Sequence, residues 1–240
     1  MDESSALDAH LATLKDQVGH PWKMDTADRD AFRNWQVQTR LDLCRLMGME
    51  SDNPPPPKSA EKVDSMSRGE LRQEKWYLQD AEGVVIPVYN LCLQTGPSKR
   101  GRILVFHGHN PNVQYCLGNY PDPETEARMR AKDNPYAEGL ALAGWEVFAV
   151  EQRGFGERQT ARMESLHEGS IQSSCRDLAI QYASLGRTVL GERVRDARTV
   201  LGWLLAADKG PVTVTGNSGG GTTALWLAAL DDRVAACLPG

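Results

Sequence analysis

Five consecutive residues, Gly216-Asn217-Ser218-Gly219-Gly220, have the types and spacing that nucleophilic chemistry requires. They follow the β-branched run Val212-Thr213-Val214 and precede the helical pattern of residues 222–230, so they fall at a strand-to-helix turn. A G-x-S-x-G sequence in that context is typical of a nucleophile elbow. Gly216 and Gly220 have no Cβ and allow strand and helix to pack closely around the bend. The pattern therefore predicts an exposed Ser218 hydroxyl, with the backbone N–H of Gly219 free to bind an oxyanion, as acyl transfer needs.

Two other kinds of site fit parts of the same sequence. Residues 216–221 have the glycine spacing of a phosphate-binding loop, but Thr222 stands where that loop needs a lysine. His107 and His109 form an H-x-H pair, but no Asp or His follows at a spacing that would complete a zinc site. We therefore expect no cofactor and no metal, and we expect His107 to pack behind its loop.

Composition excludes several classes of partner. The 240 residues have a formal charge of −5 and no basic run, which gives no support for binding to nucleic acid or to an anionic membrane. The amino terminus is acidic and lacks the apolar segment of a signal peptide, and no apolar stretch is long enough to span a bilayer. The five cysteines form no C-x-x-C pair, which is typical of a reduced, cytoplasmic protein. They are Cys44, Cys92, Cys116, Cys175 and Cys237.

The first quarter of the chain differs in pattern from the rest. Residues 26–48 form one amphipathic helical pattern with Thr26 as a plausible N-cap. Four prolines, residues 54–57, then impose an extended linker. We therefore predict a helical lead-in and proline-rich linker over residues 1–58 and a core domain over residues 59–240.

In the core domain, strand patterns alternate with helix patterns. Residues 75–79 and 84–93 form a strand pair around the turn at 80–83, and residues 102–106, 145–150, 212–214 and 234–238 are further strands. Helices are expected over residues 134–143, 176–184, 188–207 and 222–230. This alternation predicts an α/β fold with a mostly parallel sheet flanked by helices. The glycine-rich turns at 107–110, 151–156 and 216–221 each follow a strand, so we expect them to meet at one edge of the sheet.

Four segments together give the chain a resemblance to a known family. They are His107-Gly108-His109-Asn110, Gln152-Arg153-Gly154-Phe155-Gly156, Leu185-Gly186-Arg187-Thr188 and Thr215-Gly216-Asn217-Ser218-Gly219-Gly220-Gly221. In these segments the sequence resembles the α/β-hydrolase fold, and within it the acetyl-xylan-esterase-like and dienelactone-hydrolase-like bacterial esterases. The resemblance implies that Ser218 is a nucleophile and that the backbone N–H groups of Gly219 and His109 bind the oxyanion. It also implies a small-molecule or carbohydrate ester as substrate.

Charged residues near these segments have a simpler interpretation. Arg153 is expected to be a structural tie that pairs with Glu151 or Glu157. The charged residues between 192 and 198 are expected to form the solvated face of their helix.

The residues after Ser218 do not complete a catalytic triad. In this fold the acid and then the histidine follow the serine, but no histidine follows Ser218, and Asp231 and Asp232 come too early. We therefore expect a C-terminally truncated esterase, inactive by itself because a serine without a base is a poor nucleophile. Two alternatives remain open: a non-catalytic pseudo-hydrolase that acts as a binding module, and His167 serving as the base.

Overall fold

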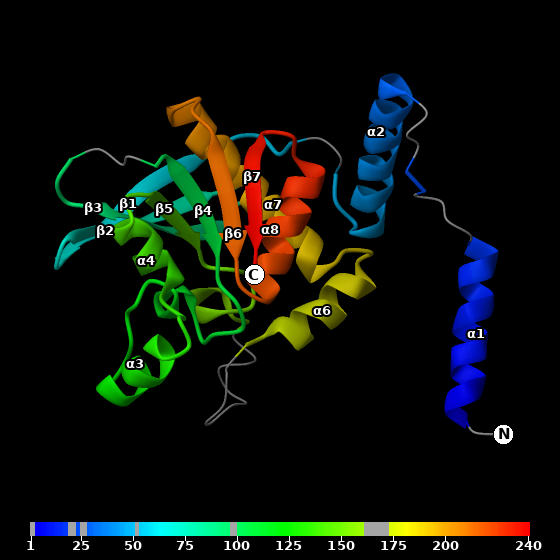
Figure 1. Ribbon diagram of the computed structural model, residues 1–240, viewed down its shortest axis with the longest axis horizontal. Coiled ribbons are helices and arrows are strands. Elements are labelled where there is room, and N and C mark those ends of the chain that lie inside the picture. The colour runs from blue at the N-terminus through cyan, green and yellow to red at the C-terminus, as the bar shows by residue number, and fades with distance from the viewer. Residues whose placement is uncertain (1–2, 19–22, 25–27, 51–52, 97–99, 161–172) are drawn as a thin grey trace. The chain divides into compact units, whose positions relative to one another are not determined.

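The computed structural model describes residues 3–18, 23–24, 28–50, 53–96, 100–160 and 173–240 (Figure 1). The chain divides into two compact units, Met1–Leu43 and Cys44–Gly240, and the helix α2 runs across this division. The predicted domain boundary after residue 58 stays a prediction. In the described part of the chain, no helix combines the length and the apolar character needed to cross a membrane.

The first unit consists of helices. α1 (Glu3–Val18) has exposed apolar side chains at helical spacing, among them Leu7, Leu11 and Leu14. α2 (Arg29–Leu46) begins after Asp28, whose carboxylate accepts hydrogen bonds from the N–H groups of Asp30 and Ala31. The sequence predicted α2 but not α1, and the proposed N-cap Thr26 lies outside the described residues.

The second unit is built on a seven-stranded mixed sheet with the order β1-β2-β3-β5-β4-β6-β7. Its strands are β1 (Ser59–Arg68), β2 (Leu71–Gln79), β3 (Val85–Leu93), β4 (Arg102–Phe106), β5 (Glu146–Val150), β6 (Val212–Gly216) and β7 (Val234–Pro239). The pairs β1–β2, β2–β3 and β3–β5 are antiparallel, and the pairs β5–β4, β4–β6 and β6–β7 are parallel. The α/β fold class is confirmed, but the sheet is mixed rather than mostly parallel, because β1, β2 and β3 form an antiparallel meander beside the parallel strands.

Helices and short 3-10 turns connect the strands and cover the sheet (Figure 1). They are η1 (Val113–Tyr115), α3 (Pro123–Arg130), α4 (Tyr136–Leu142), η2 (Gly156–Arg158), α6 (Cys175–Ser184), α7 (Val189–Ala207) and α8 (Gly219–Leu230). The predicted helices over 176–184, 188–207 and 222–230 are confirmed, and Thr188 caps α7 by accepting from the Gly191 N–H at 2.9 Å. The sequence analysis did not predict α3.

Two apolar clusters lie on opposite faces of the sheet. β4 contributes to both because its side chains alternate, with Leu104 and Phe106 on one face and Ile103 and Val105 on the other. α7 and α8 cover the first face, and α4 together with the segment 113–117 covers the second. Burial on both faces explains why residues 103–106 of β4 are a continuous apolar run and were recognisable from sequence.

Candidate active site

Ser218 has a backbone conformation that side chains rarely adopt. Its φ is 53° and its ψ is −119°, at the junction of β6 and α8, and its side chain is exposed. Among the described residues, Asp133 is the only other non-glycine residue with a positive φ. Such a conformation costs on the order of 1–3 kcal/mol and persists only where surrounding structure enforces it. The strained turn predicted from G-x-S-x-G is therefore present.

Glycines make this turn sterically possible. A Cβ on Gly220 would overlap the carbonyl of Phe106, and one on Gly216 would overlap the backbone of Gly220. A Cβ on Gly108 would lie 3.0 Å from the Asn217 carbonyl oxygen and 3.4 Å from the Ser218 Cβ. The absence of side chains at these positions lets the loop after β4 approach the elbow closely.

The strand register brings the three predicted loops to one edge. Phe106, the last residue of β4, lies opposite Val150 of β5 and Gly216 of β6. The loops that begin at 107, 151 and 217 therefore start side by side, as expected. The loop after β4 also brings the His109 ring next to the elbow. The ring atoms Cε1 and Nδ1 lie 3.1 and 3.2 Å from the position that a Cβ on Gly219 would occupy.

The three residues predicted for the site thus lie together in space. In the described part of the chain, neither the Gly219 N–H nor the His109 N–H has a hydrogen-bond acceptor. Gly219 is also the first residue of α8, where backbone N–H groups and the helix dipole favour a negative charge. The oxyanion roles of these two groups remain proposals.

Phe155 is a site residue that the sequence analysis did not single out. Its fully buried ring contacts both histidines edge-on, with centroid distances of 5.0 Å to His107 and 5.3 Å to His109. The Arg193 guanidinium lies 5.2 Å from the same ring. The sequence signal for Phe155 is its position between two glycines, Gly154 and Gly156. Both glycines have a positive φ in the structure.

The imidazole of His109 is biased toward its neutral form. Partial burial, followed by the charges of Arg193 and His107, lowers its pKa below the ordinary value of 6.5. A positive charge beside the elbow is therefore disfavoured at neutral pH. The His109 side chain is a polar, uncharged wall of the site.

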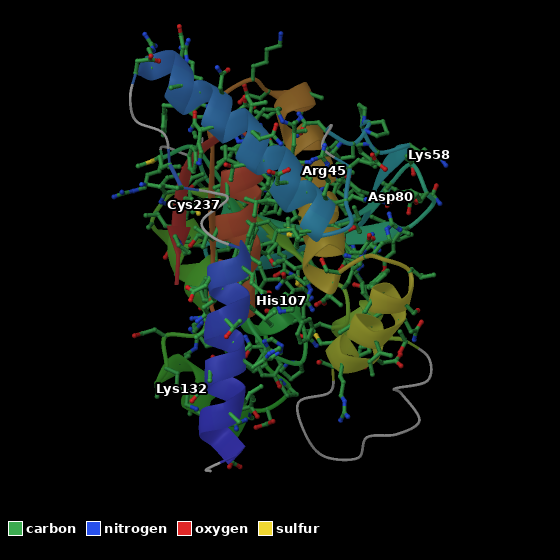
Figure 2. All side chains as sticks on the ribbon, turned by 90° about the vertical axis from the view of Figure 1, so that its right-hand side faces the viewer. Arg45, Lys58, Asp80, His107, Lys132 and Cys237 are labelled. Carbon is green, nitrogen blue, oxygen red and sulfur yellow. The ribbon has the colours of Figure 1, made fainter. Side chains whose placement is uncertain are left out.

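A buried polar network holds the loops in place beneath the elbow. His107, labelled in Figure 2, is fully buried. Its Nδ1 lies 2.8 Å from the Gly108 carbonyl oxygen, and its Nε2 lies 3.0 Å from Glu151 Oε1. The Gln152 side chain donates to the His107 carbonyl, and its Oε1 accepts from the Thr223 hydroxyl of α8 at 2.7 Å. The prediction that His107 packs behind its loop is confirmed. The network joins the loops after β4 and β5 to the helix α8.

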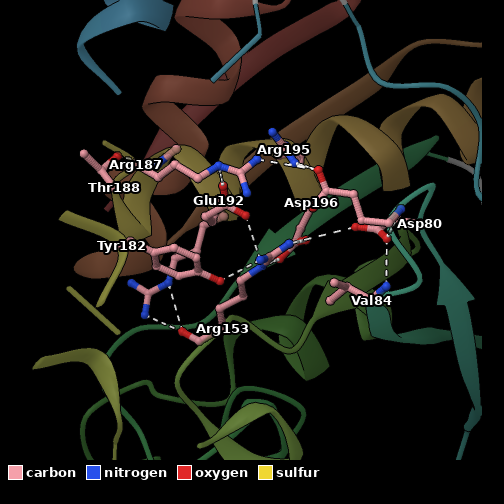
Figure 3. Close-up of polar contacts among 12 residues, drawn as sticks. Asp80, Val84, Arg153, Tyr182, Arg187, Thr188, Glu192, Arg195 and Asp196 are labelled. Carbon is pink, nitrogen blue, oxygen red and sulfur yellow. Dashed lines mark hydrogen bonds and ion pairs between the residues drawn. The ribbon is translucent and has the colours of Figure 1, made fainter. Parts of the chain in front are cut away.

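Arg153 is a structural tie, as expected, but its predicted partners were wrong. It pairs with Asp196 through two contacts of 2.9 and 2.8 Å, and with Glu192 Oε2 at 2.7 Å (Figure 3). Glu151 instead faces His107, and Glu157 pairs with Lys75 at 2.9 Å. The loop after β5 turns back over α7, and this tertiary path decides which carboxylates Arg153 meets.

The charged cluster on α7 is buried, which corrects the prediction of a solvated helix face. Glu192, Asp196 and Arg198 are each 2% exposed or less. Burial alone would raise the pKa of Asp196, but the guanidinium groups of Arg158 and Arg153 outweigh it and hold that pKa below its ordinary value. The buried carboxylates of α7 pair with arginines from other segments: Glu192 with Arg153 and Arg187, and Asp196 with Arg153 and Arg158.

The described residues contain no group of three or more His, Cys, Asp or Glu side chains arranged to hold a metal ion. His107 faces Glu151, and the exposed His109 lies on Phe155.

Comparison with solved structures places this site in a known fold. A provisionally assigned acetyl xylan esterase from Bacteroides fragilis is similar over 90% of this chain, with a TM-score of 0.73 and 20% identity. The acetyl xylan esterase from Paenibacillus sp. R4 is similar over 95% of the chain, with a TM-score of 0.52 and 18% identity. The chain has an α/β-hydrolase-like fold. A CE15 glucuronoyl esterase from Teredinibacter turnerae shares this fold over 88% of the chain, with a TM-score of 0.53 and 16% identity.

The α/β-hydrolase-like fold is shared over only part of these proteins. The chain spans 55% of the Bacteroides protein, 63% of the Paenibacillus enzyme and 52% of the glucuronoyl esterase. No family model and no curated protein sequence matches the chain.

Proposed function

We propose that this α/β-hydrolase-like domain supplies the nucleophile and the oxyanion-binding groups of a serine carboxylic ester hydrolase. The observation behind the proposal is Ser218, exposed and strained at the strand–helix turn. Its hydroxyl oxygen attacks the ester carbonyl and forms a tetrahedral intermediate. The N–H groups of Gly219 and His109 then stabilise the negative oxygen, and departure of the alcohol leaves an acyl-enzyme. Water attacks this acyl-enzyme and releases the acid.

The proposed substrate is a small-molecule or carbohydrate ester with a small acyl group such as acetyl. Support comes from the structural similarity to two acetyl xylan esterases, the provisionally assigned Bacteroides protein and the Paenibacillus enzyme. The exposed position of Ser218 is consistent with access by a carbohydrate chain.

Activation of the serine is the step for which the described residues supply no partner. In the described part of the chain, no hydrogen bond joins the Ser218 hydroxyl to a histidine, and His107 is committed to Gly108 and Glu151. His167, the alternative base, lies outside the described residues. A serine without a base is a poor nucleophile, and loss of a triad member costs several orders of magnitude in rate. We therefore expect this 240-residue chain to hydrolyse activated esters at close to the uncatalysed rate.

The second candidate function is a non-catalytic domain that binds esters at a retained elbow. The same missing hydrogen bond favours it. Both candidates require the oxyanion-binding geometry, and they differ in whether Ser218 reacts.

The test uses phenylboronic acid, which forms a tetrahedral adduct with an activated or well-placed serine. Boron-11 NMR of the wild-type chain is expected to show tetrahedral boron, which disappears in Ser218→Ala. Ser184→Ala removes a serine hydroxyl at the end of α6 and is the matched control, with the adduct retained. Boron that remains trigonal with the wild-type chain would contradict the nucleophile assignment and leave the binding domain as the better account.

Turnover of p-nitrophenyl acetate tests the second step separately. A rate near background is expected for the wild-type chain and for Ser218→Ala. Robust turnover that Ser218→Ala abolishes would show that the chain supplies its own base, while leaving the role of Ser218 intact.

A further inference from the structure

A hollow lies away from the elbow residues, in the unit formed by Cys44–Gly240. It has a volume of about 340 Å³ and is bounded by the turn between β2 and β3, by α7, and by the segments around Met49 and Pro54. This volume is within the range of sites that hold small molecules. We call it the arginine pocket, because Arg187, Arg195 and Arg198 line it.

The three arginines are not equally engaged. Arg198 is tied to backbone carbonyls, with Nη2 at 2.6 Å from the Leu230 oxygen and Nη1 at 3.3 Å from the Glu50 oxygen. Arg187 Nε pairs with Glu192 at 3.0 Å, next to Arg153 (Figure 3). Arg195 pairs through Nη1 with Glu82, and its Nε and Nη2 have no acceptor among the described residues. Arg195 is thus a guanidinium group, only 15% exposed, with unused donors in the pocket wall.

Glu82 is the carboxylate that both Arg195 and Arg187 share. It lies 3.6 Å from Arg187 Nη2 and contacts Arg195 Nη1 directly. Burial tends to raise the pKa of Glu82, but Arg195 and then Arg187 outweigh it, so that the pKa is lowered and the group is ionised at neutral pH. The two guanidinium groups are therefore arranged around a carboxylate.

The Glu82 side chain can leave these arginines without disturbing the turn that bears it. The side chain is 51% exposed, and exposed ion pairs contribute little to stability. The turn itself is held by Asp80, whose Oδ1 accepts from the N–H groups of Glu82 and Val84 at 2.9 and 2.8 Å. The backbone thus keeps its shape whether or not Glu82 contacts the arginines.

The other acidic residues of the pocket do not compete strongly for Arg195. Asp80 is used by the turn and lies 4.0 Å from Arg153 Nη2. Glu50 is exposed, and its contact with Arg198 is through its backbone oxygen. Met49, Pro54 and Pro55 add an apolar wall beside the charged one.

We propose that the arginine pocket binds a small carboxylate-bearing organic molecule, whose carboxylate replaces Glu82 at Arg187 and Arg195. The planar fork of a guanidinium group matches a carboxylate through two parallel hydrogen bonds. The body of the ligand lies against Pro54 and Pro55. This site does not depend on Ser218 or on the proposed esterase activity.

The test is an NMR titration of the full chain with benzoate, which combines a carboxylate with an apolar body. Benzamide, which has the same shape without the charge, and inorganic phosphate are the comparison probes. Benzoate is expected to bind the wild-type chain more tightly than either. Equal affinities for benzoate and benzamide would overturn the proposal. A higher affinity for phosphate than for benzoate would also overturn it and would indicate that the pocket binds phosphate.

Two substitutions are expected to act in opposite directions. Glu82→Gln removes the competing charge and should tighten benzoate binding about tenfold, whereas Arg195→Gln should weaken it by about tenfold or more. Arg128→Gln, on the exposed helix α3, and Ser218→Ala should leave it unchanged. Unchanged benzoate affinity in Glu82→Gln would contradict the proposal. If Arg195→Gln does not fold, Glu82→Gln alone is the test.

Discussion

The helices α7 and α8 cover the same face of the sheet with opposite chemistry. α8 contains no charged residue and packs through Gly220, Gly221, Ala224 and Leu227. α7 contributes apolar side chains to the same core and also buries the charged residues Glu192, Arg193, Asp196 and Arg198.

The difference in composition between α7 and α8 corresponds to the part of the site that each helix contacts. α8 must approach the Phe106 carbonyl closely enough to impose the strained conformation of Ser218, and only small residues allow this. α7 must hold the loop after β5, whose polar backbone and Arg153 need hydrogen bonds and countercharges. α8 can approach the strand closely because it has no bulky side chains there, whereas α7 holds the loop in place with charged side chains.

The largest expected effect comes from breaking the charged side of α7. Asp196→Asn leaves Arg153 and Arg158 without their shared carboxylate in a buried setting, so the free energy of unfolding should fall by about 3–5 kcal/mol. Urea unfolding measures this loss. Asp208→Asn at the exposed end of α7 is the control, with a change below about 1 kcal/mol. Equal losses in the two variants would show that the α7 cluster does not stabilise the fold.

The next effect comes from filling the close approach of α8. Gly220→Ala places a methyl group against the Phe106 carbonyl and should cost about 1–3 kcal/mol of stability. It should also abolish the boronate adduct, because Ser218 shifts with the helix. Gly139→Ala on α4 has no atom within 4 Å of the new Cβ and should be neutral or slightly stabilising. A Gly220→Ala variant as stable as Gly139→Ala would contradict the close-packing account.

A smaller effect, of opposite sign, is expected at the elbow itself. Ser218→Gly removes the Cβ from a residue at φ 53° and should raise the stability by about 1 kcal/mol while abolishing the adduct. Ser218→Ala keeps the Cβ and should leave the stability nearly unchanged. Thermal melting of the two variants compares them directly, and an equal melting temperature would show that Ser218 is not strained.

The smallest expected effect is the titration of His109. Its pKa is lowered in the folded chain, so the unfolded chain binds the proton more readily. The stability should therefore decrease as the pH falls from about 6.5 through the lower folded-state pKa. Proton NMR, with the His109 signal assigned by its loss in His109→Gln, should give a pKa below 6.5. A pKa at or above 6.5 would contradict the effect of burial and of Arg193.

Local patterns determined much of this protein. The buried strands β4 and β5 each contain a run of four apolar residues, at 103–106 and 147–150, near glycine turns. α7 has a periodic apolar face, so both element types were evident without a structure. The elbow was the strongest case, because Gly216, Ser218 and Gly220 specify the turn through their own sterics. β1 was missed because all but its last residue are exposed and its sequence has no apolar alternation, so only pairing with β2 makes it a strand.

The sequence by itself determined the fold class, the loops that meet at one sheet edge and the position of Ser218. Only the tertiary structure decided that the α7 charges are buried, that Arg153 pairs with Asp196, and that Phe155 contacts two histidines. Apolar periodicity and glycine turns are properties of neighbouring residues, so they can be recognised locally. The partner of a charged side chain depends on which distant loop folds over it, and that is a property of the whole chain.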